Sequence, residues 1–438
     1  MLSTKAFTAL TLLRAGVLAP ERPDRAARCV RVVARWGPTA AAGCAVSAIR
    51  HPEGIAIIDD LGSLTFDELQ RRTNALAHGL REAGIVENDV VAIMCANHRG
   101  FVEATIACSK LGAHVLLLDT TFEAAQVAQV CAREAPVAIV CDEEFSAAAA
   151  DAASGRLLVL AWTDAPAAGT PTLEALIAAG DHDELAPPSA PGRQVVLTRG
   201  TTKGVIRDQP ATLDPVAGLL AMIPLRARER TLIAVPLFES WGLAQLAIGA
   251  GLSSTLVLRR RFDARETLRA IDEHGVTALI AAPDVLSAIL DLGAKVIGRD
   301  DSGSLRVIAS GGRALPSALA PRVMDAFGDV LYNVYGSAEV AWATIATPQD
   351  LRAAPTTAGR APRGTVVRLY DDEDGELTVP GRSGRIFAGG EMSFEGYTGA
   401  TAATTIDGLV ATGDSGHLND DGVLFVDARE HGVPNLDG

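Results

Sequence analysis

The hydrophobic pattern of the chain alternates between short apolar runs and longer segments with helical periodicity. Thr65 and Glu68 form a T-x-x-E capping box, after which Leu69, Leu76 and Leu80 recur at helical spacing. Apolar strands are predicted at 90–95, 114–118 and 137–141, and helices at 101–111 and 123–133. Short strands that are apolar at every position are typical of a parallel sheet with helices on both faces.

A second region with the same alternation follows residues 145–192, which are rich in Ala, Pro and Gly. Its strands are predicted at 195–198, 231–235, 255–258, 278–281, 306–309 and 330–334. After about residue 360 the pattern changes to short strands separated by Asp-Gly and Gly turns, at 365–370, 375–379, 384–390 and 420–428. Such strands predict the hairpins of a small β-barrel.

The pattern therefore predicts an α/β fold with two layered, largely parallel α/β units and a small β-barrel. The predicted parts are a helical lead-in at 1–50, a first α/β unit at 51–190, a second at 191–360, the β-barrel at 361–428 and a short terminal stub at 429–438.

Composition and charge narrow the class of protein. The 438 residues are 48% hydrophobic and carry a net charge of −14, which argues against nucleic-acid binding. The six cysteines contain no CxxC pair, which favours reduced thiols in a cytoplasmic protein. Residues 1–50 hold eight basic and two acidic residues, a net charge of +6, so the remainder carries −20.

The basic segment predicts a helix whose arginines share one side, namely Arg25, Arg28, Arg31 and Arg35. The apolar residues Val30, Val33, Ala34 and Trp36 fall mostly on the other side. A basic amphipathic helix can lie on an anionic membrane surface, which would make the protein membrane-peripheral. The alternative is a solvated arginine face over a packed helix.

Polar and glycine-rich segments follow several predicted strands. Residues 195–207 read VVLTRGTTKGVIR, and the GxxxxGK[ST] spacing of a Walker A loop is absent. SGGRAL at 310–315 and YNVYGSAE at 332–339 follow later strands, and ATGDSGHLNDDG at 411–422 lies in the β-rich region. Ligands of open α/β sheets bind beyond the carboxyl ends of strands, where the segments at 310–315 and 332–339 are expected.

In this order, the four segments resemble those of the adenylate-forming superfamily, which includes acyl-CoA synthetases and fatty-acyl-AMP ligases. The resemblance runs from about Thr65 to Arg429 and looks closest to actinobacterial fatty-acid CoA ligases. It implies a ligase that activates a carboxylic acid, a fatty acid, with MgATP to an acyl-adenylate. Coenzyme A or an acyl carrier protein would then accept the acyl group.

The resemblance also implies site residues. The loop that wraps the ATP phosphates is matched by Thr198, Gly200, Thr201, Thr202 and Lys203, although it is three residues short and has Arg199 at the position of a small residue. Glu339 matches the Mg²⁺ ligand, and Asp414 the carboxylate that accepts the ribose hydroxyls, with Arg429 as the arginine that follows it.

The remaining matches concern the adenine and the acyl group. Adenine is expected to lie against Gly311, Gly312 and Arg313, and to be bordered, with the acyl carboxylate, by Tyr335, Gly336 and Ser337. The acyl pocket is expected to be lined by Phe238, Glu239, Trp241 and Gly242.

Simpler interpretations stay open for each of these residues. The loop at 198–204 also fits an ordinary polar strand-to-helix turn, Glu339 a solvated residue after a strand, and Trp241 a core tryptophan. The last lysine is Lys295, so the catalytic lysine of a mobile C-terminal domain is expected to be absent or supplied by a separate domain. The alternative function is a noncatalytic or repurposed homologue that binds the acyl group or the nucleotide without turning over ATP.

Overall fold

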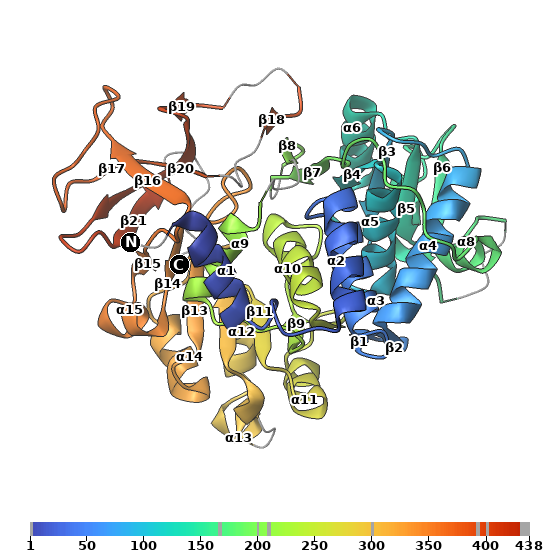
Figure 1. Cartoon of the computed structure of the whole chain (residues 1–438). Helices are drawn as coiled ribbons and strands as arrows, with labels where there is room; N and C mark the ends of the chain where they lie inside the picture. The colour runs from blue at the N-terminus through green and yellow to red at the C-terminus, as the bar shows by residue number, and fades with distance from the viewer. Residues whose placement is uncertain are drawn as a thin grey trace.

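Three β-sheets organise the chain (Figure 1). The computed structural model describes residues 3–164, 169–198, 201–207, 212–298, 302–390, 395–399 and 403–429, with the backbone alone for 428 and 429. Two sheets are mostly parallel and the third is antiparallel. The predicted α/β fold class, with two layered parallel units and a smaller β-rich unit, is confirmed.

The first sheet has seven strands in the order β18-β8-β7-β4-β3-β5-β6, of which the five from β7 to β6 are parallel. Val91 and Ile93 face the core that contains α4 and α5, whereas Ala92 and Met94 face the core that contains α6. Because both faces are buried, the central residues of these parallel strands are apolar. The strands are β3 (Val90–Met94), β4 (His114–Leu117), β5 (Ala138–Asp142), β6 (Leu157–Trp162), β7 (Gln194–Leu197), β8 (Gly204–Arg207) and β18 (Gly396–Tyr397). The helices are α4 (Phe66–Glu82), α5 (Arg99–Leu111), α6 (Ala124–Glu134), α7 (Glu143–Ala149) and α8 (Leu173–Ala179).

The second sheet has eight strands in the order β14-β13-β12-β11-β9-β10-β1-β2, parallel except at its two edges. The strands are β1 (Ile55–Asp59), β2 (Gly62–Thr65), β9 (Arg230–Ile233), β10 (Thr255–Leu258), β11 (Ala278–Ala281), β12 (Val307–Ser310), β13 (Leu331–Tyr335) and β14 (Thr344–Ala346). The helical elements of this region are α9 (Asp214–Met222), α10 (Ser240–Leu252), α11 (Ala264–His274), α12 (Pro283–Leu290), α13 (Ala294–Ile297), η1 (Ser302–Ser304), α14 (Leu319–Phe327) and α15 (Pro348–Ala353). One continuous core joins α10 to α4 and α5 between the two sheets.

The two parallel sheets exchange strands across the predicted boundary near residue 190. Strands β1 and β2 come from the range 51–190 but pair in the second sheet, beside β10. Strands β7 and β8 come from the range 191–360 but pair in the first sheet, beside β4. Each of the two sheets therefore contains strands from both sides of residue 190. The predicted domain limits stay a prediction.

The third sheet is antiparallel, and its described strands follow an open path in the order β15-β21-β20-β17-β16, with β19 beside β20. They are β15 (Thr357–Gly359), β16 (Thr365–Tyr370), β17 (Gly384–Gly390), β19 (Thr405–Ile406), β20 (Leu409–Leu418) and β21 (Leu424–Arg429). The strand predicted at 375–379 is not formed, since only a single bridge joins Glu376 to Tyr370. An Asp371 side chain that accepts from the Gly375 N–H holds this segment as a turn instead.

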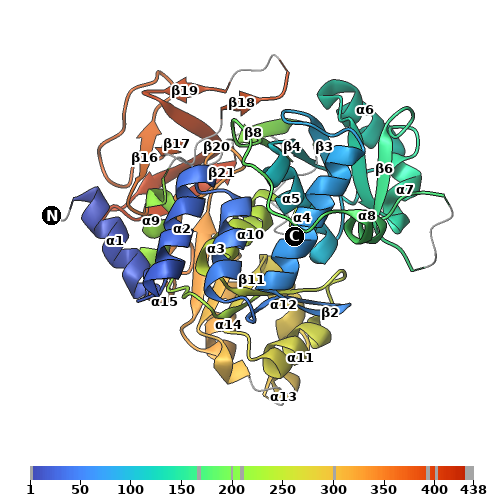
Figure 2. The same ribbon diagram turned by 45° about the vertical axis from the view of Figure 1, so that its right-hand side comes forward.

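Three N-terminal helices pack in series on this framework: α1 (Thr4–Arg14) on α9, α2 (Pro23–Trp36) on α3, and α3 (Ala40–Arg50) on α4, α5 and α10. Figure 2 shows α2 beside α3. In α2, Val32 and Trp36 are buried, whereas Val30 and Val33 are exposed. Of the apolar residues that the helical spacing places opposite the arginines, Trp36 thus faces the core, whereas Val30 and Val33 face outward. None of the described helices combines the length and apolar composition needed to cross a bilayer.

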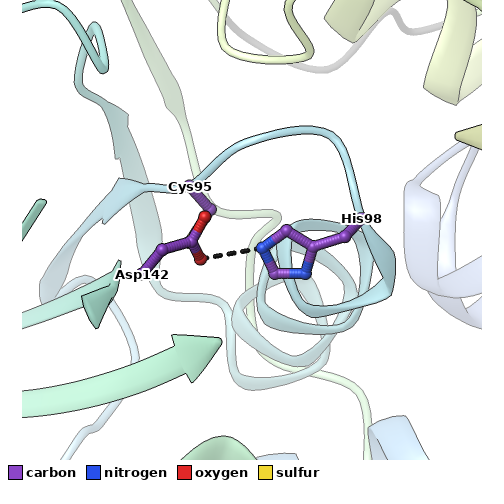
Figure 3. A group of neighbouring side chains, drawn as sticks. All are labelled: Cys95, His98 and Asp142. Carbon is purple, nitrogen blue, oxygen red and sulfur yellow. Dashed lines mark hydrogen bonds and ion pairs between the residues drawn. The ribbon is translucent and has the colours of Figure 1, made fainter. Parts of the chain in front are cut away.

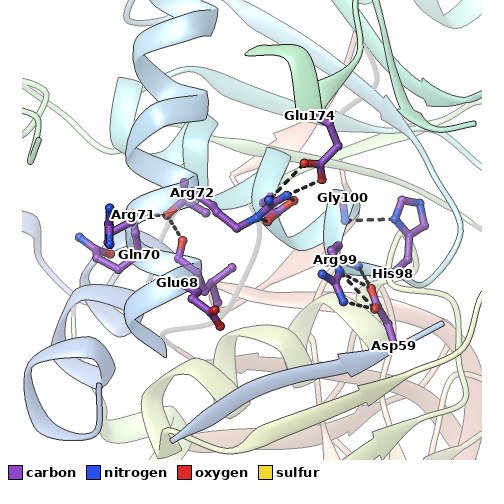
Figure 4. Close-up of polar contacts among 12 residues, drawn as sticks. Asp59, Glu68, Gln70, Arg71, Arg72, His98, Arg99, Gly100 and Glu174 are labelled. Carbon is purple, nitrogen blue, oxygen red and sulfur yellow. Dashed lines mark hydrogen bonds and ion pairs between the residues drawn. The ribbon is translucent and has the colours of Figure 1, made fainter. Parts of the chain in front are cut away.

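A buried ion pair ties the two parallel sheets together (Figure 4). Asp59 ends β1, and Arg99 begins α5 after β3. The Arg99 backbone N–H and Nε each lie 2.9 Å from Asp59 Oδ2, and Nη2 lies 2.5 Å from Oδ1. Burial alone would raise the pKa of Asp59, but the hydrogen bonds from Arg99 outweigh it and lower that pKa. The pair therefore fixes the strand ends of one sheet against the other.

Candidate active site

The predicted segments 332–339 and 411–422 meet at the carboxyl end of β13. Tyr335 ends this strand, and its hydroxyl donates to Asp414 Oδ2 at 2.8 Å, with Thr412 Oγ1 at 3.0 Å. Asp414 lies in β20 and is buried. The hydrogen bond therefore joins the second sheet to the third and places the predicted ribose carboxylate beside the segment that contains Glu339.

Glu339 is held by a tyrosine that the sequence interpretation did not single out. The Tyr397 hydroxyl donates to Glu339 Oε1 at 2.8 Å, and Lys203 Nζ lies 3.3 Å from the centroid of the Tyr397 ring. Strand β18 brings Tyr397 there, because it pairs with β8 opposite Val205. Burial, followed by the charge of Glu339, raises the pKa of Tyr397, so the phenol stays a hydrogen-bond donor. Lys203, Tyr397 and Glu339 thus form one contiguous group.

A buried arginine approaches the same group from β8. Arg207 Nε donates to the carbonyl oxygen of Ala338 at 2.9 Å, and no described residue accepts from Arg207 Nη2. Burial lowers the pKa of Arg207 to about 10, while the charge of Glu339 acts in the opposite direction. The guanidinium is therefore still cationic at neutral pH. A buried cation with an unused donor beside a carboxylate suits a phosphate chain that carries a metal ion.

The predicted phosphate loop connects two antiparallel strands, β7 and β8, rather than a strand and a helix. The Thr198 N–H donates to the Lys203 carbonyl at 2.8 Å, and the Thr201 N–H donates to the Thr198 carbonyl at 3.0 Å. The Lys203 N–H donates to Thr201 Oγ1 at 3.2 Å, and the Thr202 carbonyl accepts from Arg133. These backbone donors serve the turn itself, which leaves the side chains of Thr198 and Lys203 for a ligand. Arg199 and Gly200 lie outside the described residues.

The turn before Glu339 depends on a glycine and a serine. A Cβ at Gly336 would overlap the carbonyl oxygen of Ala341, so only glycine fits this close approach. The Glu339 N–H donates to Ser337 Oγ at 3.3 Å. Both features fix the backbone that presents the Glu339 carboxylate.

The predicted acyl and adenine segments lie against each other. Glu239 occupies the N-cap position of α10 without a side-chain hydrogen bond to the helix, and Trp241 is buried in the first turn. A Cβ at Gly311 would lie 3.1 Å from the Trp241 indole, and one at Gly312 would lie 3.8 Å from Glu239 Oε2. Gly312 also has φ +81°, a backbone conformation that favours glycine. The indole therefore forms a wall directly beside the Gly311 backbone.

The loop before α10 is positioned by the first sheet. Asn97, after β3, donates through Nδ2 to the Val235 carbonyl at 2.7 Å and accepts from the Leu237 N–H at 2.9 Å. Phe238 is buried at the end of this loop, and Gly242 lies where a Cβ would overlap the Pro236 carbonyl oxygen. The predicted acyl residues are thus held by both parallel sheets.

Two predicted residues have other surroundings. Arg313 Nη1 lies 2.7 Å from Asp284 Oδ2 in a partly exposed ion pair with α12. The backbone of Arg429 is opposite Asp414 in the ladder between β20 and β21, and its side chain is not described. Neither observation tests the predicted binding roles.

A buried Cys95–His98–Asp142 group has the residue types of a metal site (Figure 3). The Gly100 N–H donates to His98 Nδ1 at 3.0 Å, and His98 Nε2 lies 2.8 Å from Asp142 Oδ1. Since Nδ1 accepts, the ring proton resides on Nε2 and is donated to Asp142. A metal ion on Nε2 would require an imidazolate, whereas metal-bound histidines donate a proton through their other nitrogen. Together with burial, which raises the pKa of Cys95, this hydrogen bonding indicates a structural cap of α5.

Comparison with known proteins defines the class. A family model described as "AMP-binding enzyme" matches residues 44–398. The chain therefore belongs to the AMP-binding enzyme family. An indoleacetate–CoA ligase from Aromatoleum aromaticum is 30% identical over 88% of this chain and 75% of its own length. A feruloyl-CoA synthase from an Amycolatopsis species is 28% identical over 86% of this chain and 75% of its own length.

Solved structures support the fold. The amide bond synthetase from Marinactinospora thermotolerans has a TM-score of 0.77 and 27% identity, covering 89% of this chain and 79% of that chain. The o-succinylbenzoate CoA synthetase from Bacillus subtilis in complex with AMP has a TM-score of 0.76 and 23% identity, covering 88% of this chain and 78% of that chain. The adenylate-forming resemblance is confirmed at the level of the family, and the actinobacterial fatty-acid subfamily stays a prediction.

Proposed function

We propose that the protein is an AMP-forming ligase that activates a carboxylic acid with MgATP and transfers the acyl group to coenzyme A or a carrier protein. The observation that carries the proposal is the hydrogen bond that joins Asp414, in β20, to Tyr335 at the end of β13. Tyr335 lies only four residues before Glu339 in the sequence, so its bond to Asp414 relates the two carboxylates. Lys203 and Arg207 supply positive charge beside Glu339. This arrangement fits a nucleotide, because the ribose hydroxyls need hydrogen-bond acceptors and the phosphates need cations.

The proposed reaction assigns a task to each group. The acid's carboxylate oxygen attacks the α-phosphorus of ATP, the bond to the bridging oxygen breaks, and pyrophosphate leaves. Arg207 and Lys203 stabilise the charge on the departing phosphates, and Asp414 accepts from the ribose hydroxyls. A Mg²⁺ ion, when bound, would neutralise phosphate charge, and Glu339 offers the hard oxygen ligand that it prefers. The thiolate of the acceptor then attacks the acyl carbonyl carbon and AMP leaves.

The test is acid-dependent exchange of radioactive pyrophosphate into ATP. Wild-type protein is incubated with ATP, Mg²⁺ and a panel of straight-chain fatty acids and aryl acids of matched size. Exchange above the acid-free rate supports the proposal, and the acid that maximises it defines the substrate class. Absence of exchange with every acid, at high protein concentration, would contradict it.

We propose an apolar acid, with the fatty acid predicted from the sequence as the first class to examine. The segment around Phe238 and Trp241 is buried and apolar, which suits an acyl group rather than a charged substrate. The relatives named above act on indoleacetate and ferulate, so aryl acids are the comparison class.

Trp241→Ala is expected to favour longer acids. Removing the indole opens space beside the Gly311 backbone, because the indole packs directly against it and a Cβ on Gly311 would lie only 3.1 Å away. We expect the ratio of kcat/KM for a twelve-carbon over a six-carbon acid to rise about 10-fold. The control is Trp162→Ala. Trp162 ends strand β6 of the first sheet, and its ring lies under the Arg260 guanidinium. An unchanged ratio would remove Trp241 from the acyl wall.

Tyr397→Phe is expected to weaken metal use without disturbing the acid. The change removes the hydroxyl that donates to Glu339 Oε1 and keeps the ring beneath Lys203. Partners that orient a ligating carboxylate typically contribute 10- to 100-fold, so we expect the Mg²⁺ concentration for half-maximal exchange to rise about 10-fold. Tyr370→Phe is matched, because it removes a tyrosine–carboxylate hydrogen bond to Asp407 in the third sheet. Equal Mg²⁺ dependence in both variants would contradict a positioning role for Tyr397.

One observation favours the second candidate, a nucleotide-binding homologue without ATP turnover. The backbone N–H groups of Thr198, Thr201 and Lys203 bind within the loop itself, so these three described residues do not offer them to phosphates. Calorimetry with AMP, ATP and an acyl-adenylate analogue distinguishes the two. Tight binding of AMP or the analogue without exchange would favour the second candidate.

A further inference from the structure

Helix α2 presents apolar side chains to solvent. Val30 is 69% exposed and Val33 is 48% exposed, and Ala27 and Ala34 lie on the same outer face. A contiguous apolar face on the outside of a helix indicates an interaction surface. The family model begins at residue 44, so this helix lies outside the part of the chain that defines the family.

Three arginines flank this apolar face. A groove of about 310 Å³ between α2, α3 and α4 is lined by Arg28, Arg31 and Arg35. The carboxylates that line the same groove are those of Asp67 and Glu184. None of the three arginines forms an ion pair with a described residue, whereas Arg25, one turn earlier, lies 3.9 Å from Glu21. The guanidinium groups are therefore available to an anionic partner.

We propose that the outer face of α2 binds the surface of an anionic lipid bilayer. Val30 and Val33 would enter the headgroup region, while Arg28, Arg31 and Arg35 would bind lipid phosphates. The charge distribution orients the protein, because residues 1–50 carry +6 and the remainder carries −20, which the bilayer repels. A two-fold contact between copies through α2 would instead place like-charged arginines against one another.

The test is co-sedimentation of the full chain with vesicles. The wild type is compared on vesicles of phosphatidylcholine alone and of phosphatidylcholine with about 30% phosphatidylglycerol. We expect binding to the anionic vesicles only, weakened when salt rises to several hundred millimolar because of screening. Soluble glycerol phosphate at millimolar concentration should compete weakly, since it lacks the apolar phase. Equal binding to neutral vesicles, or none to anionic vesicles, would overturn the proposal.

Matched variants locate the surface. Replacing Arg28, Arg31 and Arg35 by Gln is expected to lower the partition coefficient about 100-fold, at about five-fold per arginine. Replacing Arg261, Arg269 and Arg322 by Gln changes the net charge equally on other elements and should leave binding within two-fold. Val30→Ser with Val33→Ser should lower binding at high salt as well as low salt. Equal binding by both arginine variants, or a dimer by sedimentation that the α2 variants abolish, would assign this face to another partner.

Discussion

We expect Glu339→Gln to lower acid-dependent pyrophosphate exchange about 10²- to 10³-fold, the typical effect of removing one electrostatic group from a reaction centre. The amide keeps the size of the side chain and can still accept from Tyr397, but it loses the negative charge that a hard cation needs. The loss also leaves Arg207, buried within the same group, without its neighbouring anion. Exchange rates measured across a range of Mg²⁺ concentrations test the expectation.

Glu376→Gln provides the control for this variant. Glu376 is an exposed carboxylate 3.3 Å from Arg368 in the third sheet, and it is not part of the group formed by Lys203, Tyr397 and Glu339. A change of less than two-fold is expected there, because exposed ion pairs contribute little. Thermal unfolding of both variants separates a loss of chemistry from a loss of fold. Near-normal exchange by a folded Glu339→Gln protein would remove Glu339 from the proposed mechanism.

The elements that could be predicted are those whose residues bury both faces of a strand or one face of a helix. The strands β3, β4, β10, β11 and β12 are almost entirely apolar because each lies between two cores, and that pattern is local. The order of strands is not local. Nothing in residues 55–65 indicates that they pair beside residues 255–258, since this pairing depends on the shared core around α10.

The candidate site shows the same division. Glu339 and Asp414 could be identified from their motifs, and the structure joins their segments through Tyr335. Arg207 and Tyr397 were missed, because one ends a short apolar strand and the other lies in a two-residue strand whose partner is distant in sequence. The available signal for Arg207 was an arginine directly after the apolar residues Val205 and Ile206. The exposure of Val30 could not be predicted, since helical spacing alone does not say which face is packed.

The largest expected effect on stability is that of Asp59→Asn, which we expect to lower the free energy of unfolding by about 3–5 kcal/mol. The Asp59 side chain is fully buried, and Arg99 donates to both of its oxygens. The neutral amide leaves the Arg99 guanidinium as a buried cation without its counter-charge. Urea unfolding at neutral pH, followed by far-UV circular dichroism, measures the change.

The pH dependence gives this expectation a sign. Because the pKa of Asp59 is lowered in the folded protein, its stabilisation is present above the pKa of the unfolded state, about 3.9, and is lost as the pH falls through the folded pKa. The difference between wild type and Asp59→Asn should therefore be constant from pH 7 to about pH 5 and shrink below about pH 4.

Replacing both Asp59 and Arg99 tests whether the loss of stability comes from the unpaired charge. Asp59→Asn combined with Arg99→Met leaves no buried charge at this position, so much of the lost stability should return. Asp329→Asn, which breaks an exposed pair with Arg352, should cost less than about 1 kcal/mol. Asn97, two residues before Arg99, holds the loop that leads to Trp241, so displacement of the α5 N-terminus should also reduce exchange activity in Asp59→Asn. A loss of stability below about 1 kcal/mol in Asp59→Asn would show that the two sheets do not depend on this pair. The expected effect of the pair on the loop that leads to Trp241 would then have no basis.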